Sequence, residues 1–219
     1  KVLLTGTALV AVASFSTPAH ALARVLTANG TWASSGTCNA ATSAIADACA
    51  NDAVDITAGG AVTLTVTNDA TANDGSGVNT FNLGAVTNTG AGTGALSVLN
   101  GGNNALTVTI ASSNVKGNTT FTNTNAANSQ NTSGVTGALT VGGALAVTNA
   151  NATGNKAVAV TVGGAVTVTG ATTITANVGA GGGANSTLTI GGNATFTGGV
   201  TMDDNTGTTT LTFNGSSAQ

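Results

Sequence analysis

Few side chains in this sequence could perform acid–base or nucleophilic chemistry. Its 219 residues contain a single His, His20, and neither Glu nor Tyr. A Ser-His-Asp or Cys-His system needs a His beside its nucleophile. His20 lies in the apolar N-terminal segment that we interpret below as a signal peptide. The sequence therefore predicts no catalytic residues, and we expect that the protein is not an enzyme.

Asp203 and Asp204 form the only adjacent pair of carboxylates. Two carboxyl groups can act as acid and base in carbohydrate hydrolysis. Adjacent residues of a strand face opposite ways, however, and Asp-Asp-Asn-Thr-Gly is a typical turn sequence. We predict a turn at this pair.

The other Asp residues raise the alternative of a cation site. Asp47, Asp52 and Asp55 together could offer carboxylates to Ca²⁺. Asp69 and Asp74 lie in a segment that is faintly similar to a calcium loop, but it lacks the bidentate acid at its end. We predict a solvated loop there, and no metal and no cofactor for the chain.

Cys38 and Cys49 are the only cysteines. Two thiols without His cannot complete a four-ligand zinc site, and their spacing is not that of a Cys-x-x-Cys redox motif. In an oxidising compartment such a pair forms a disulfide. The Ala-rich stretch Ala40–Ala50 is the one segment with helical character, so we predict a short, disulfide-tied helical cap.

The N-terminus is typical of a secretory signal peptide. Lys1 precedes an apolar run from Val2 to Phe15, which at about 14 residues is shorter than the roughly 20 needed to span a bilayer. Ala19 and Ala21 are the small residues that a signal peptidase recognises. We predict cleavage after Ala21, with cleavage after Ala23 as the alternative, and location at the cell surface, in the outer membrane or outside the cell.

The composition favours many short strands. Only 5% of the residues are charged, the formal net charge is −3, and Gly occurs 32 times. Thr and Val pack well on a pleated surface, and Gly and Asn suit the turns between strands. The four basic residues are scattered, so no surface could neutralise a row of phosphates, and we expect no nucleic-acid partner.

A repeated unit combines an apolar-Thr-apolar segment, a Gly pair and a second alternating segment. We align residues 139–148, 160–169 and 188–197, with 56–65 as an earlier relative. In each unit Val and Leu should face inward and Thr outward, while Gly turns the chain where a Cβ would clash or φ must be positive. The predicted turn glycines are Gly59, Gly60, Gly142, Gly143, Gly163, Gly164, Gly191 and Gly192.

These features predict an all-β fold, a parallel β-helix (β-solenoid) in which stacked coils share one core. We divide the chain into a signal peptide (1–21), an N-terminal cap segment with the Cys pair (22–55) and β-solenoid repeats (56–219). The last segment is still strand-like where the sequence stops, so we expect the repeats to continue beyond it.

The signal peptide and the repeats of the type LTIGGNATFTGGVT resemble passenger domains of autotransporters, the repetitive surface proteins of Gram-negative, alphaproteobacterial type. The resemblance implies a right-handed β-helix and a C-terminal β-barrel of the same polypeptide as its only membrane contact. It also implies a non-catalytic stalk for adhesion or structural display, whose partners are host or cell-surface molecules or further copies of itself.

The alternative function is that of a small secreted ice-binding or self-assembling, fibre-forming β-solenoid. An ice-binding face needs Thr at one coil position on every coil. The marker glycines Gly143, Gly164 and Gly192 are 21 and 28 residues apart. This uneven spacing argues against a regular Thr face.

Overall fold

A computed structural model describes residues 23–32, 52–67, 78–102, 104–124, 130–150, 156–176, 184–204 and 207–215. All regular secondary structure in these ranges is β-strand, and the strands stack in parallel. This confirms the predicted all-β parallel solenoid. The predicted signal peptide with Ala19 and Ala21, the predicted helical segment 40–50 and the pair Cys38 and Cys49 lie outside the described residues, as do Asp47, Asp69 and Asp74.

The first of two sheets has eleven strands. Eight of them follow one path: β1 (Ala23–Leu26), β3 (Ala53–Ile56), β5 (Val78–Thr87), β7 (Ala105–Val115), β9 (Asn131–Val135), β12 (Val158–Val162), β15 (Ser186–Ile190) and β18 (Thr209–Phe213). The strands from β5 to β18 on this path form what we call the long face. The other three form the short face: β10 (Leu139–Val141), β13 (Val166–Val168) and β16 (Ala194–Phe196). The short face continues through the C-terminal ends of β7 and β5 to β3 and β1, because Leu139 pairs with Ser113, Ser113 with Val86 and Val86 with Val54.

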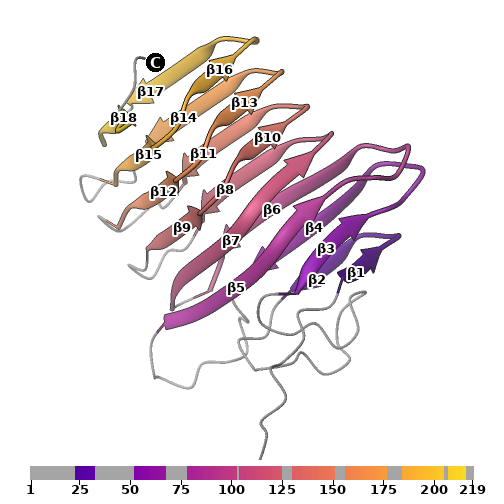
Figure 1. Cartoon of the computed structure of the whole chain (residues 1–219). Helices are drawn as coiled ribbons and strands as arrows, with labels where there is room; N and C mark the ends of the chain where they lie inside the picture. The colour runs from indigo at the N-terminus through magenta and orange to yellow at the C-terminus, as the bar shows by residue number, and fades with distance from the viewer. Residues whose placement is uncertain are drawn as a thin grey trace, which may run out of the picture.

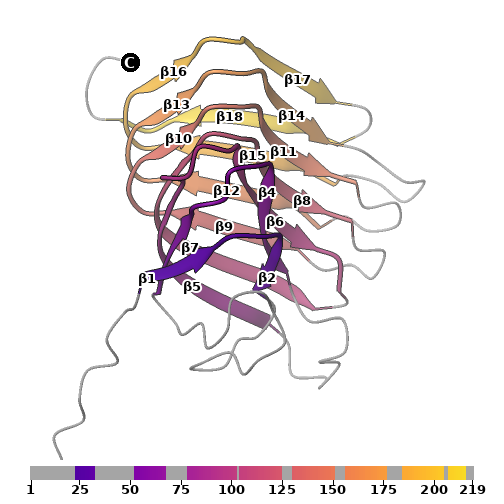
Figure 2. The same cartoon turned by 90° about the vertical axis from the view of Figure 1, so that its right-hand side faces the viewer.

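The second sheet has seven strands. They are β2 (Gly30–Trp32), β4 (Val62–Thr67), β6 (Gly94–Asn100), β8 (Thr119–Asn123), β11 (Leu145–Asn149), β14 (Thr172–Ala176) and β17 (Val200–Asp204). From β9 onward each coil has one strand on the long face, one on the short face and one in the second sheet, which gives the three-sided outline of Figure 2. The coils are stacked in chain order (Figure 1).

The core is a column of alternating apolar side chains from all three sides. Leu139, Val141, Val160 and Val162 are buried, whereas Thr161 is exposed, as the alternation predicts. Each inward side chain lies next to its register partner one coil away, for example Val160 beside Leu188. Because no coil can enclose its own apolar residues, the stability of the rod comes from this stacking between coils.

The glycine pairs occupy two different corners of the coil. Gly142-Gly143 separates the short face from the second sheet, whereas Gly163-Gly164 and Gly191-Gly192 separate the long face from the short face. The register pairs Leu139 with Val166 and Val166 with Ala194. Our alignment of residues 139–148 with 160–169 is therefore wrong, because the first range lies one corner later in its coil.

Measured in the register, two successive coils of the short face are nearly equal in length. Leu139 and Val166 are 27 residues apart, and Val166 and Ala194 are 28 apart. The 21-residue interval between Gly143 and Gly164 runs from one corner to another and is not a coil length. Both corners carry the same apolar-Thr-apolar-Gly pattern because the backbone approaches closely at both.

Close approach, rather than backbone conformation, explains these glycines. A Cβ on Gly164 would lie 2.6 Å from the carbonyl carbon of Gly137 in the preceding coil. The Gly164 N–H donates to the Gly137 carbonyl at 3.0 Å, so the two corners cannot separate without losing a hydrogen bond. Among the described glycines only Gly199 has a positive φ, of 82°. Gly59 and Gly60 differ, since a Cβ there would meet nothing within 4 Å.

From β9 onward, variation in coil length is confined to the third corner, between the second sheet and the long face, which we call the variable corner. The two other corners have three residues in each coil from β9 onward (136–138 and 142–144 in the first of them). The connections at the variable corner span residues 124–130, 150–157, 177–185 and 205–208. Insertions here leave the register of all three sides unchanged.

Strands β1 and β2 and all but the last residue of β3 lie within residues 22–55, the range that we assigned to the cap segment, and they pair with the coils that follow. Arg24 on β1 donates from Nε to Oδ2 of the fully buried Asp52 at 2.7 Å. The backbone carbonyl of Asp52 also accepts from the Gly84 N–H at 2.7 Å. This ion pair links the first two coils of the short face, and the Gly84 bond joins the second of these coils to the third.

Candidate functional site

Outward Thr side chains form a regular surface on the long face. Two parallel rows cross six successive strands, from β5 to β18. The first row is Thr80, Thr107, Thr132, Ala159, Thr187 and Thr210, and the second is Asn82, Thr109, Gly134, Thr161, Thr189 and Thr212. We call these twelve positions the threonine face; nine of them are Thr.

This regularity removes our argument against an ordered Thr surface. The uneven glycine spacing suggested that Thr could not recur at one coil position. In the structure the differences in coil length from β9 onward lie at the variable corner, and the strands from β5 to β18 stay in register. Thr187, for example, pairs with Ala159 on one side and Thr210 on the other. That argument was therefore wrong.

The hydroxyl groups of the threonine face are largely uncommitted. Within the described part of the chain, Thr132 is the one Thr of this face whose hydroxyl takes part in a hydrogen bond, from Gln130 Nε2 at 3.1 Å. The second sheet also has outward Thr, such as Thr148, Thr173, Thr175 and Thr201, and on this surface Thr120 donates its hydroxyl to Ser97 at 3.2 Å. The same surface includes Leu99 and Asp203 at outward register positions, so it is less uniform.

A buried column of Asn closes the variable corner from the inside. Asn100, Asn123 and Asn149 are register partners at the ends of β6, β8 and β11, and all three are fully buried. Nδ2 of Asn100 donates to the Gln130 carbonyl at 2.9 Å, and Nδ2 of Asn149 to the Lys156 carbonyl at 2.6 Å. The column therefore fixes the chain where it returns to the long face.

Sequence reasoning missed this column because it placed Asn in the turns between strands. The available signal was an Asn at the end of an alternating segment, as in Phe-Thr-Asn (121–123) and Val-Thr-Asn (147–149). In the next coil Ala176 takes the same register position, which ends the run of Asn there.

The described carboxylates mainly connect coils. Asp52 pairs with Arg24, and Asp55 on β3 accepts from the Thr89 N–H at 3.0 Å, the Thr89 hydroxyl at 2.6 Å and the Thr87 hydroxyl at 3.1 Å. Burial acts to raise the pKa of Asp55, but the hydrogen bonds from Thr89 and Thr87 outweigh it and hold the pKa below its ordinary value of 3.8. Asp52 and Asp55 thus have structural partners on neighbouring coils.

The pair Asp203 and Asp204 does not form the predicted turn, because both residues belong to β17. Their register partners are Thr175 and Ala176, which lie on opposite faces of β14. Asp204 Oδ1 accepts from the N–H of Thr209 at 2.6 Å and also from its hydroxyl. The turn prediction failed because β-pairing with β14 extends the strand through both residues.

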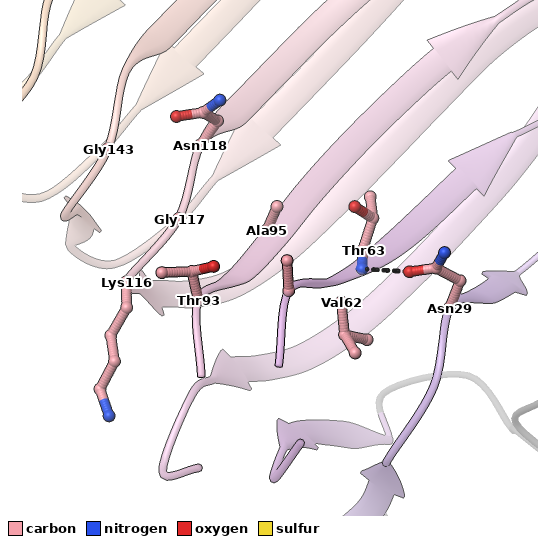
Figure 3. A pocket seen from close by; sticks show the side chains of 10 residues that line it. Asn29, Val62, Thr63, Thr93, Ala95, Lys116, Gly117, Asn118 and Gly143 are labelled. Atoms are coloured by element: carbon pink, nitrogen blue, oxygen red, sulfur yellow. Dashed lines mark hydrogen bonds between the residues drawn. The ribbon is translucent and has the colours of Figure 1, made fainter. Parts of the chain in front are cut away.

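A pocket of about 460 Å³ lies at the corner that precedes the second sheet (Figure 3). Its side chains come from successive coils: Asn29, Thr63, Thr93 and Asn118 contribute polar groups. Asn29 Oδ1 accepts from the Thr63 N–H at 2.9 Å, and Asn118 Oδ1 accepts from the Ala144 N–H at 2.9 Å, so both amides also tie coils together. Lys116, at the rim, donates to the Gly90 carbonyl.

No group of three or more His, Cys, Asp or Glu side chains that could hold a metal ion occurs among the described residues. A search of the same residues finds no helix with the length and apolar character that crossing a membrane requires. Comparison of the chain with protein-family models, with curated proteins and with solved structures gives no match.

Proposed function

We propose that this chain is the exported, non-catalytic stalk of a cell-surface protein, of the kind found in autotransporter passengers. The observation that carries the proposal is the confinement of all length variation, from β9 onward, to the variable corner. A stalk needs a cross-section that stays constant, and display needs one site where sequence can change without cost to the stack. The solenoid combines the two.

The roles of its polar side chains support a scaffold. Asn149, Asp52 and Asp55 use their polar atoms to bind backbone or side chains of neighbouring coils. Buried polar groups bonded in this way favour one register over the alternatives, because a shifted register would leave them unsatisfied. A rod whose polar side chains connect its coils is suited to a structural role rather than to positioning reactants for catalysis.

Adhesion to host or cell-surface molecules, or to further copies of the chain, belongs to the same proposal. Binding residues in repeat proteins are commonly carried by loops on a rigid scaffold. The variable corner is the place for them here, since its connections differ in length from coil to coil. Its polar base, with Gln130 and Lys156 held by the Asn column, supports such loops.

Protease treatment of intact producing cells tests this function. Full-length chain should disappear while a cytoplasmic marker survives, and mass spectrometry of the mature protein should find Leu22 as its first residue. Replacing Ala21 by a large residue should cause the uncleaved form to accumulate, whereas the same change at Ala28 should not. A chain that stays protected in intact cells and keeps its N-terminal segment would overturn the proposal.

A further inference from the structure

We propose that the threonine face binds the surface of ice crystals. This activity is separate from the stalk function, because it depends on the long face and not on where the chain is displayed. It is carried by the register of β5, β7, β9, β12, β15 and β18, which brings nine Thr side chains into two rows.

The spacing of these rows is set by β-sheet geometry. Neighbouring strands lie about 4.8 Å apart, and residues i and i+2 of one strand about 6.6 Å apart. Thr187 and Thr189 on β15 therefore form one edge of a repeating cell, and Thr210 and Thr212 on β18 form the next. The result is a two-dimensional array of hydroxyl and methyl groups, with repeats close to those of water oxygens on a prism face of hexagonal ice.

The chemistry of the face fits ordered water better than a sugar or a protein. Protein and carbohydrate partners are typically gripped by aromatic or charged anchors. All twelve positions of the threonine face are Thr, Ala, Gly or Asn, so it offers neither. Each Thr hydroxyl can both donate and accept a hydrogen bond, while its methyl group can occupy a gap between water molecules.

The threonine face is also prepared for binding. Among the described residues, the hydroxyls of Thr187, Thr189, Thr210 and Thr212 make no hydrogen bond within the protein, so they can bond to water without breaking one. Thr has a restricted χ1 because of its branched Cβ. Each Thr on a strand between β5 and β18 also lies between register partners on the two neighbouring strands. Little side-chain entropy is therefore lost when the surface meets a rigid lattice.

The test is retention of the fluorescently labelled full chain in a growing ice hemisphere. The double variant Thr161→Lys with Thr189→Lys places charge and bulk at the centre of the threonine face. Its matched control, Thr148→Lys with Thr175→Lys, makes the same change on the outward side of the second sheet. Circular dichroism establishes that each variant is folded. If a Lys variant fails to fold, Thr189→Ser and Thr175→Ser replace it.

The unmodified chain should be incorporated into ice. The long-face variant should lose most of that incorporation, and the second-sheet control should keep it. Exclusion of the unmodified chain from ice, to the level of an ordinary labelled protein, overturns the proposal. Equal loss in the two variants overturns the assignment of binding to the threonine face.

Discussion

Asn149 and Lys156 are joined across the variable corner by a 2.6 Å hydrogen bond from the Asn149 side-chain amide to the Lys156 carbonyl. The same Nδ2 also donates to the Asn185 carbonyl, one coil further on, at 3.2 Å. A single buried side chain thus bonds to the backbone just before β12 and just before β15. The variable corner can differ in length because its base is fixed from inside the core.

Replacing Asn149 by Ala should therefore destabilise the solenoid, because the carbonyls of Lys156 and Asn185 lose a donor that a fully buried side chain supplies. We expect a loss of about 2–3 kcal/mol in the free energy of unfolding. Urea denaturation followed by circular dichroism measures it. Thr148→Ala, on the outward side of the same strand, is the control and should cost well under half as much. Equal effects at the two positions would contradict the structural role of the Asn column.

The glycine corners predict a sharp difference between two Gly→Ala substitutions. Gly164→Ala should destabilise the protein by about 1–3 kcal/mol, because the new Cβ forces apart two backbones that share a hydrogen bond. Gly60→Ala is the matched control, since its Cβ would meet nothing within 4 Å, and it should change stability by less than about 0.5 kcal/mol. The denaturation midpoints of the two variants decide the matter; a tolerated Gly164→Ala would show that the coils are not this closely stacked.

One buried hydroxyl predicts a stabilising substitution. Thr172 points into the core beside Leu145, and its Oγ1 is buried without a hydrogen-bond partner. Thr172→Val keeps the shape of the side chain and removes the unsatisfied group, so we expect about 1 kcal/mol of added stability. Thermal unfolding measures this gain. Thr173→Val, which changes the adjacent outward residue, should give no comparable increase, and a destabilised Thr172→Val would show that the hydroxyl is bonded.

Asp55 predicts a pH-dependent contribution to stability. Its pKa is lowered in the folded state, so the stabilisation is present above the ordinary pKa of 3.8 and is lost as pH falls through the lower folded value. The Asp55→Asn variant should be less stable than the unmodified chain near neutral pH, with the gap closing in acid. Urea titrations at a series of pH values measure the gap; a constant gap would rule out the charged hydrogen bonds as its source.

Alternation and glycine content were enough to predict the solenoid and the orientation of residues such as Val160 and Thr161. Two features were not accessible in this way. The corner occupied by Gly142-Gly143 could not be distinguished from that of Gly163-Gly164, because both corners require the same close approach and so the same residues. Asn149 looks like a loop residue in the sequence, and only the register with Asn123 shows that it is buried.

The regular Thr surface was hidden for a related reason. Residues with the same outward position, such as Thr161 and Thr189, are separated by a connection whose length varies. The number of residues between two such positions therefore depends on both the strand register and the loop length. Only the strand pairing in the structure shows the register by itself.

The central claim is that one corner of a rigid surface stalk is free to vary. An epitope inserted into the β11–β12 connection (150–157) of the full protein, detected by antibody on intact producing cells, tests it most directly. The account predicts strong labelling of intact cells and an unchanged unfolding midpoint, whereas the same insertion at the three-residue corner 142–144 should abolish folding. Labelling of the 150–157 insertion only after lysis would contradict surface display, and equal tolerance of both insertions would contradict the single variable corner.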